Sequence, residues 1–182
     1  MAGLTSRLAG PDDIPALEAV MAAAIAELQR GFLTPAQIEA SRTIMGLDRQ
    51  LIADGTYFVV EAPDDFGGRI AGCGGWSRRA TLYGGDHSPG RDAALLDPAA
   101  DPARVRAMYT HPDFARRGVG RLILELCEAA AGAEGFTRLE LMATMSGRPL
   151  YARAGYVEIE HILDDRGGEP VPLVRMGKAI GA

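Results

Sequence analysis

Residues 104–124 read RVRAMYTHPDFARRGVGRLIL, and this stretch decides which fold the chain can adopt. The alternating side chains of Arg104–Thr110 predict a strand. Pro112 then marks a turn, and after Gly120 the apolar side chains recur at helical spacing as far as Ala130. The order of these signals predicts a strand that runs through a short turn into a helix.

The start of that helix has features that favour an anion. A helix N-terminus presents N–H groups that have no acceptor within the helix. Gly118 and Gly120 lack side chains, so a phosphate can approach the backbone closely. Arg116, Arg117 and Arg121 add guanidinium groups that suit phosphate oxygens. The stretch predicts a diphosphate-binding turn, while a solvated turn that packs closely at Gly118 fits the same spacing.

The rest of the chain predicts elements of both kinds around this unit. Strands are expected at 4–9, 56–61, 69–76, 136–143, 156–162 and 171–177, and helices at 14–29, from a Thr34 cap to about Leu51, and at 149–155. The second and third of these strands, joined by a PDDFGG turn at 63–68, and the last two strands are predicted hairpins. Two strand–helix–strand units add parallel pairing, so we expect an α/β fold with a mixed central sheet flanked by helices.

Composition limits the class of protein. Hydrophobic residues make up 47% and charged residues 24% of the 182 residues, and we expect a single domain over residues 1–182. The net charge of -5 disfavours general affinity for nucleic acid or acidic membranes. Cys73 and Cys127 are predicted to be buried thiols in a reducing cytoplasm, not disulfide partners or metal ligands. No apolar run approaches the roughly 18 to 20 residues that cross a bilayer, and no signal-peptide core is present, so we expect a cytoplasmic protein.

Two segments carry a family resemblance. VRAMYTHPDFARRGVGRLILELCEAA, followed by SGRPLYARAGYVEI, resembles the GCN5-related N-acetyltransferases. Their phosphate-binding signature is Gln/Arg-x-x-Gly-x-Gly/Ala after a strand, and a Tyr…Gly-Phe/Tyr segment follows the next strand. This similarity is sharp over about residues 104–160, and the predicted order of elements is similar over nearly the whole chain. The resemblance implies the fold of that family, acetyl-CoA as co-substrate, a primary amine of a small molecule or peptide as acceptor, and a homodimer as one assembly the chain could form.

The resemblance also assigns residues. The implied cofactor-binding residues are Met108, Tyr109, Thr110, Arg116, Arg117, Gly118, Val119, Gly120, Arg121 and Ser146. The strand residues of this set would receive the pantetheine arm as if it were another strand, and the turn amides would hold the pyrophosphate. A strand N–H near Met108 would face the thioester oxygen. Tyr151 matches the tyrosine that donates a proton to the departing CoA thiolate, although an ordinary core position also fits it. Ser146 stands where relatives often have an asparagine that contacts the cofactor.

Two positions depart from the family pattern. Ala115 occupies the first Gln/Arg position of the signature, beside Arg116 and Arg117. Arg104 stands where many relatives have a strand glutamate that serves as general base, so the base is left unassigned. Candidate bases are Glu61, His87, Asp101 and His111, while His161 has no predicted partner. A solvated or structural role fits each of them as well.

The acceptor and the alternative functions follow from the remaining residues. The acceptor site is expected between the first two helices and the aperiodic loop at 77–102, in which Tyr83, Asp86, His87, Arg91 and Asp92 are gathered. The excess of acidic over basic residues favours a cationic acceptor.

A non-catalytic acyl-CoA-binding sensor is the main alternative to an acetyltransferase. A nucleotide-dependent oxidoreductase or NTP-binding protein is another, but GVGRLI supplies only part of the dinucleotide fingerprint.

Overall fold

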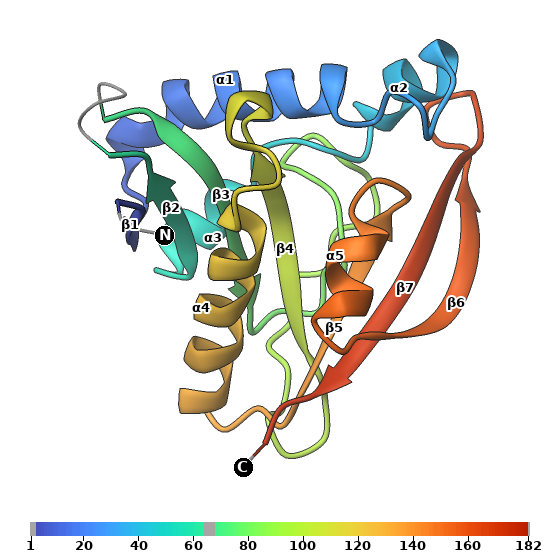
Figure 1. Cartoon of the computed structure of the whole chain (residues 1–182). Helices are drawn as coiled ribbons and strands as arrows, with labels where there is room; N and C mark the ends of the chain where they lie inside the picture. The colour runs from blue at the N-terminus through green and yellow to red at the C-terminus, as the bar shows by residue number, and fades with distance from the viewer. Residues whose placement is uncertain (1–2, 64–67, 182) are drawn as a thin grey trace.

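The computed structural model, which describes residues 3–63 and 68–181, is built on one seven-stranded sheet (Figure 1). Its strands are β1 (Thr5–Leu8), β2 (Tyr57–Glu61), β3 (Ile70–Ser77), β4 (Ala103–Thr110), β5 (Arg138–Thr144), β6 (Val157–Asp164) and β7 (Val171–Ala179). They lie in the order β1-β2-β3-β4-β5-β7-β6, and every neighbouring pair is antiparallel except β4 with β5. The predicted mixed sheet and both hairpins are confirmed, while residues 64–67 of the predicted PDDFGG turn lie outside the described residues.

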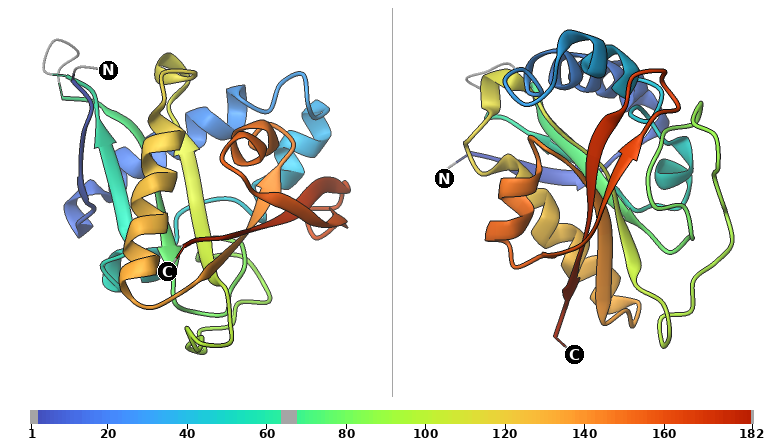
Figure 2. Two further views of the ribbon diagram at one scale, coloured as in Figure 1. Left: turned by 60° about the horizontal axis from the view of Figure 1, so that its bottom comes forward. Right: turned by 90° about the vertical axis from the view of Figure 1, so that its right-hand side faces the viewer.

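Helices cover both faces of the sheet, as Figure 2 shows. They are α1 (Ile14–Glu27), α2 (Pro35–Ser41), α3 (Arg49–Ala53), α4 (Val119–Ala133) and α5 (Arg148–Arg153), with 3₁₀ turns at Pro11–Asp13 and Pro112–Phe114. The helices α4 and α5 lie on one face, while α1, α3 and the long loop at 78–102 lie toward the other. The prediction of an irregular loop here is confirmed, because only isolated bridge and turn contacts interrupt it.

The predicted helix from Thr34 to about Leu51 is wrong in its length, because the chain forms two short helices there. Thr34 does cap the first, since its hydroxyl accepts a hydrogen bond from the backbone N–H of Gln37. Gly46 then has a φ of 147°, which lies far from any helical value. Asp48 starts α3 by accepting a hydrogen bond from the backbone N–H of Gln50 at 3.0 Å.

Apolar side chains on the two faces of the sheet form separate cores. Val60 and Leu139 belong to the core that α4 covers with Ile123. The alternate position Val59 belongs to the core that α1 covers with Leu17. Because successive residues of a strand point to opposite faces of the sheet, each strand contributes side chains to both cores. The same alternation places successive β4 side chains on opposite sides of the sheet.

The sheet opens between β4 and β5. These parallel strands are paired only at Ala103 with Leu139 and at Arg104 with Glu140, and beyond these two pairs no further pairing joins their described residues. A bulge in β4 lies next to the opening, where Ala107 has a φ of 49°. The N–H of His111 donates to Ala71 of β3, so the alternation of an antiparallel pair directs the N–H of Thr110 away from β3, toward the gap, while the bulge at Ala107 and Met108 interrupts the alternation.

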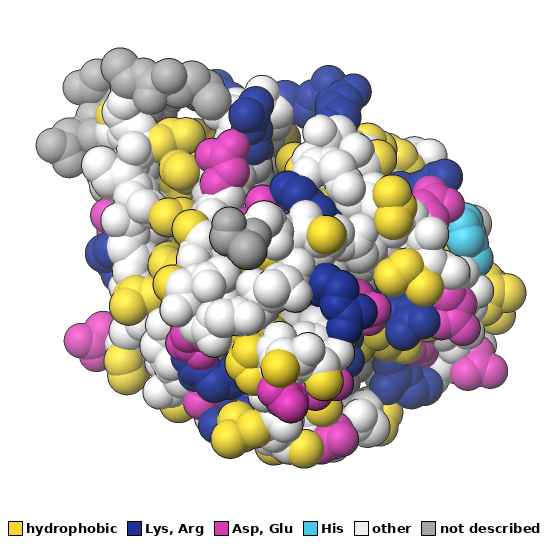
Figure 3. All heavy atoms as spheres, turned by 90° about the horizontal axis from the view of Figure 1, so that it is seen from below, with side chains coloured by type: hydrophobic (Ala, Val, Ile, Leu, Met, Phe, Trp, Pro, Cys, Tyr) yellow, Lys and Arg dark blue, Asp and Glu magenta, His cyan; other side chains and the backbone are white. Residues whose placement is uncertain are grey.

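The surface carries charges of both signs. On the face seen in Figure 3, acidic and basic side chains are interspersed and do not gather into one patch of a single sign. None of the helices in the described part of the chain has the length and hydropathy that a membrane span requires.

Candidate active site

A wide cleft of about 940 Å³ lies between the start of α4, the helix α5 and the gap between β4 and β5. Nine of the ten predicted cofactor-binding residues line it: Met108, Tyr109, Thr110, Arg116, Gly118, Val119, Gly120, Arg121 and Ser146. The tenth, Arg117, is not part of the lining; its guanidinium lies over the ring of Phe114, 5.7 Å from the centroid. The fold thus brings the two predicted segments together in one cleft.

The start of α4 presents backbone amides to this cleft. Gly118 is the N-cap residue with a φ of 83°, and no side chain of the described residues caps the helix. The first helical hydrogen bond runs from the N–H of Leu122 to the carbonyl of Gly118 at 3.0 Å. The N–H groups from Gly118 to Arg121 therefore have no acceptor within the helix. A Cβ at Gly120 would lie 2.8 Å from Cδ2 of Leu150, so this turn also packs closely against α5.

Basic side chains exceed acidic ones around the cleft. The charged lining residues are Arg116, Arg121, Arg153, Lys178, Glu125 and Glu128. The carboxylate of Glu125 pairs with Arg121 at 2.8 Å, and that of Glu128 pairs with Lys178 at 2.8 Å. Arg116 and Arg153 form no ion pair among the described residues. The cleft therefore has a net positive lining beside unpaired helix amides, which favours an anion.

A second, inner cavity of about 90 Å³ adjoins the cleft. Its walls come from residues 44–46 after α2, residues 82–84 of the long loop, the strands β4, β5 and β7, and Tyr151 of α5. The residues that line both the cleft and this cavity are Met45, Met108, Tyr109, Thr144 and Tyr151. The parting of β4 and β5 therefore joins the two spaces.

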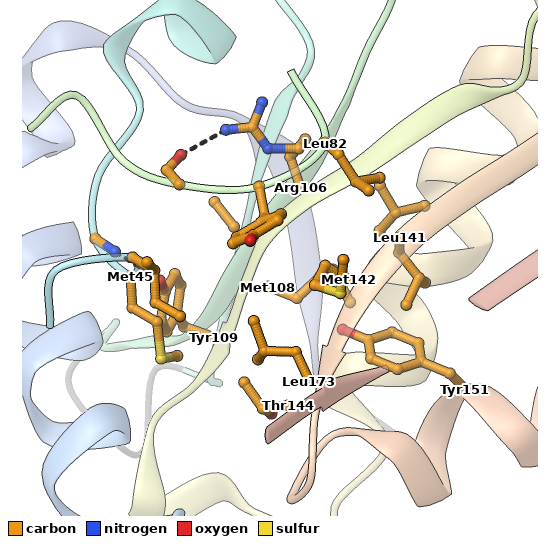
Figure 4. Close-up of a pocket in the computed structure, with 16 residues that line it drawn as sticks. Met45, Leu82, Arg106, Met108, Tyr109, Leu141, Met142, Thr144, Tyr151 and Leu173 are labelled. Carbon is orange, nitrogen blue, oxygen red and sulfur yellow. Dashed lines mark hydrogen bonds between the residues drawn. The ribbon is translucent and has the colours of Figure 1, made fainter. Parts of the chain in front are cut away.

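Tyr151 points from α5 into the inner cavity, toward Met108 and Met142 (Figure 4). Its side chain is 7% exposed, and its hydroxyl makes no hydrogen bond to any described residue. Burial raises the pKa of Tyr151 above its usual value of 10.0, so the hydroxyl keeps its proton at neutral pH. The ring of Tyr156 contacts it edge-on, with centroids 6.1 Å apart.

Two other tyrosines line the inner cavity. The hydroxyl of Tyr109 accepts a hydrogen bond from the N–H of Gly46 at 2.8 Å, and burial raises the pKa of Tyr109. The hydroxyl of Tyr83 donates to Asp164 at 2.8 Å, and burial followed by that carboxylate raises the pKa of Tyr83 to about 12. Both groups are neutral at pH 7.

A buried ionic network holds the long loop against the inner cavity. Arg106 of β4 donates to Asp48 at 2.9 Å and to the carbonyl groups of Thr81 and Gly84. Arg91 of the loop donates to the other oxygen of Asp48, also at 2.9 Å. Because Asp48 is the N-cap of α3, this network fixes α3, β4 and the loop to one another.

The polar residues predicted in the long loop mostly hold its own shape. Asp86 pairs with Arg49 at 2.7 Å, and His87 lies 2.6 Å from the carbonyl of Arg42. Asp92 accepts a hydrogen bond from the N–H of Ala94. Of the five polar residues predicted here, only Tyr83 lines the inner cavity.

The structure places the candidate bases away from both spaces. Neither lining includes any of Glu61, His87, Asp101, His111 or His161. Their contacts are local: Glu61 binds Arg7, Asp101 accepts from the N–H of Asp97, His111 accepts from the N–H of Asp113, and His161 lies beside Glu158. Arg104 pairs with Glu140 at 2.9 Å and lines neither space.

Sequence reasoning missed the remaining polar wall of the inner cavity. In the sequence, Arg106 is one of two alternating arginines in the strand RVRAMYT, and nothing distinguishes it from Arg104. Its partner Asp48 lies 58 residues away along the chain. Met45 and Gly46 lie in a segment that was predicted to be helical. No local pattern marks any of these residues as part of a site.

Comparison with known proteins agrees with this geometry. A family model described as an acetyltransferase (GNAT) domain matches residues 53–158. No curated protein matches the chain. Many solved structures share the fold, and three of them are described below.

A GCN5-related N-acetyltransferase structure from Rhodopseudomonas palustris has a TM-score of 0.72 at 22% identity, and the match covers 99% of this chain and 98% of that one. A putative acetyltransferase from Salmonella typhimurium, with its cofactor acetyl-CoA, has a TM-score of 0.64 at 14% identity over 98% and 95% of the two chains. PaiA N-acetyltransferase from Thermoplasma acidophilum, in complex with coenzyme A, has a TM-score of 0.62 at 13% identity over 97% and 99%.

These structural likenesses concern the fold. The family model, by contrast, matches more than half of the sequence, and its range includes the strand–turn–helix unit, the strands β4 and β5 between which the sheet opens, and Tyr151. This chain belongs to the GNAT acetyltransferase family.

Proposed function

We propose that this protein transfers the acetyl group of acetyl-CoA directly to a primary amine of a small molecule or peptide, with Tyr151 as the acid that protonates the CoA thiolate. The observation that carries the proposal is the cleft that runs from the free amides at Gly118–Arg121 to Tyr151, where it shares its wall with the inner cavity. Bound acetyl-CoA would supply the thioester from which the acetyl group leaves.

The residues of the cleft suit coenzyme A. The unpaired N–H groups at the start of α4, with Arg116 beside them, would hold the pyrophosphate. The N–H of Thr110 faces the gap, and it would pair with the pantetheine arm, together with backbone groups of Met108 in the bulge, as an added strand would. The hydroxyl of Ser146, 3.2 Å from that of Thr144, lines the same cleft.

Tyr151 has the properties that an acid in this reaction needs. It lies where the cleft meets the inner cavity, its hydroxyl is free of protein partners, and its raised pKa keeps it protonated. A general acid that meets the leaving group in the transition state accelerates reactions by about 10² to 10⁴. Both cysteines are fully buried, Cys73 in β3 and Cys127 in α4, which favours direct transfer over a thioacyl intermediate.

The acceptor must lose a proton before it attacks. An alkyl amine has a pKa near that of lysine, about 10.4, so its free base at pH 7 lies roughly 4 to 5 kcal/mol above the ammonium form. No aspartate, glutamate or histidine lines the inner cavity. We propose that the amine enters this cavity as the free base, helped by desolvation and by relay through water.

The lack of a lining base also favours the alternative, a non-catalytic acyl-CoA sensor. The nucleotide-dependent oxidoreductase has no such support, because a dinucleotide-binding sheet is mostly parallel and here β4 with β5 is the single parallel pair among the described strands.

Calorimetry with acetyl-CoA and a thiol-release assay over a panel of small amines and peptides test the proposal. We expect acetyl-CoA to bind with micromolar or tighter affinity and to release thiol only when an accepted amine is present. Binding without release for every amine would support the sensor. Stabilisation by NADH or ATP with no heat from acetyl-CoA would remove the proposal altogether.

A further inference from the structure

The inner cavity has an unusual charge for a site that would receive an amine. Arg106 is the single charged residue among those that line it. The other walls are apolar side chains, three tyrosines, Thr144 and backbone. A protonated ammonium group therefore meets one cation and no lining anion, which disfavours a simple cationic acceptor.

The network behind Arg106 leaves this positive charge incompletely balanced. Asp48 is shared by the guanidinium groups of Arg91 and Arg106, so the three charges sum to one positive unit. Only 3% of Arg106 is exposed, so water hydrates its guanidinium group poorly. This desolvation disfavours the charged form and lowers the pKa of Arg106. Asp164, which accepts from the hydroxyl of Tyr83, pairs with Arg166, so this unit is neutral and adds no compensating anion.

Arg106 also has unused hydrogen-bond donors. Nη2 donates to Asp48 and to the carbonyl of Gly84, and Nη1 donates once, to the carbonyl of Thr81. A guanidinium group has five N–H bonds. The Nε–H and one N–H of Nη1 therefore have no acceptor among the described residues, and Nε keeps some accessible surface. Figure 4 shows Arg106 across the cavity from Thr144.

The size of the cavity limits what can supply the missing acceptor. At about 90 Å³, it is smaller than the cavity of about 150 Å³ that holds a benzene molecule. It therefore admits only a few non-hydrogen atoms. A carboxylate on a short aliphatic stem matches both the size and the charge.

We infer that the acceptor is a small amine that carries a carboxylate, and that Arg106 is the residue which selects that carboxylate. The inference rests on the proposed acetyl transfer and names its substrate class. The carboxylate would lie at Arg106, while the amine would lie toward Tyr151 and the thioester. The net negative charge of the chain predicts a cationic acceptor. The positive charge at the inner cavity favours instead an acceptor that carries a carboxylate.

The test compares alanine, alaninamide and ethylamine as acceptors for the wild-type protein, by thiol release from acetyl-CoA. Rates are expressed per unprotonated amine, which removes differences in amine pKa. A charge-assisted hydrogen bond predicts that kcat/KM for alanine exceeds that for alaninamide by about tenfold or more. Equal values for alanine and alaninamide, or faster turnover of ethylamine, would overturn the inference while leaving the acetyltransferase function in place.

A binding measurement covers the case of slow turnover. N-acetylalanine and N-acetylalaninamide are titrated calorimetrically into the protein saturated with CoA, and tighter binding of the carboxylate is expected. Absence of any difference counts against the inference even without catalysis. Failure of acetyl-CoA itself to bind would instead count against the proposed function.

Two matched variants assign the effect to one residue. Arg106→Gln should lose the preference for alanine, with acetyl-CoA binding as the check that the protein is folded. Arg104→Gln removes the other arginine of the same strand, which pairs with Glu140 outside both spaces, and should keep the full preference. An Arg106→Gln protein that binds acetyl-CoA and still prefers alanine would show that Arg106 does not select the carboxylate.

Discussion

Replacing Tyr151 with phenylalanine separates catalysis from stability. The hydroxyl of Tyr151 makes no hydrogen bond to the described residues, so its removal breaks no protein contact. Because a partner is not left unsatisfied, we expect the free energy of unfolding to change by less than about 1 kcal/mol. Loss of a general acid, by contrast, predicts a fall in kcat of about 10² to 10⁴, or roughly 3 to 5 kcal/mol in the activation barrier.

The assay measures kcat and KM by thiol release, acetyl-CoA affinity by calorimetry, and stability by thermal unfolding. Tyr156→Phe is the matched control, because its hydroxyl is also buried, makes no hydrogen bond to the described residues although the carboxylate of Glu128 lies near it, and lines neither space. We expect Tyr156→Phe to keep the wild-type kcat. If Tyr151→Phe keeps its kcat as well, another group or water protonates the thiolate and the role assigned to Tyr151 is wrong.

Three further predictions concern the elements that shape the site. Gly118→Ala forces a left-handed φ of 83° on a residue with a Cβ, so the free energy of unfolding should fall by about 1–2 kcal/mol and CoA binding should weaken. Gly132→Ala, inside the same helix, is the control and should be neutral or stabilising by about 0.5–1 kcal/mol; thermal unfolding and calorimetry measure both variants. Asp48→Asn leaves Arg91 and Arg106 without their shared carboxylate and should lower the free energy of unfolding in urea by about 3–5 kcal/mol. A loss below about 1 kcal/mol would show that this ionic network does not stabilise the fold. The hydrogen bond from the guanidinium of Arg79 lowers the pKa of Asp54 below its usual 3.8, so Asp54 stabilises the fold above pH 3.8 and loses this contribution as the pH falls through its folded-state pKa. The wild type should therefore unfold at higher urea than Asp54→Asn at pH 7, and the gap should narrow steadily as the pH falls below 3.8.

The strand–turn–helix unit could be predicted because its signals are local. Alternation marks Arg104–Thr110, and glycines with arginines mark the helix start within a few residues. The same locality explains the failure between Thr34 and Leu51. Helical periodicity continues through that segment, but α2 already ends at Ser41, and the non-helical residues 42–48, with a φ of 147° at Gly46, separate it from α3. The N–H of Gly46 donates to the hydroxyl of Tyr109, a distant contact that no local pattern reveals.

The inner cavity could not be predicted, because it depends on contacts between distant segments. Arg106 meets Asp48 across 58 residues, and Tyr109 meets Gly46 across 63. Sequence reasoning therefore searched for a base among conspicuous acids and histidines. The structure instead surrounds the inner cavity, where we propose that the acceptor binds, with apolar residues, tyrosines and one arginine, which a search for titrating groups does not single out.

The opening between β4 and β5 has a consequence for solubility. An unpaired strand edge on the outside of a protein can recruit strands of other chains and start aggregation. Here the unpaired stretch of β4 lies in the middle of the sheet, between α4 and α5, and not along either outer edge, so another protein's strand would have to enter between these helices. The chain can therefore keep an incomplete sheet without inviting self-association at that edge.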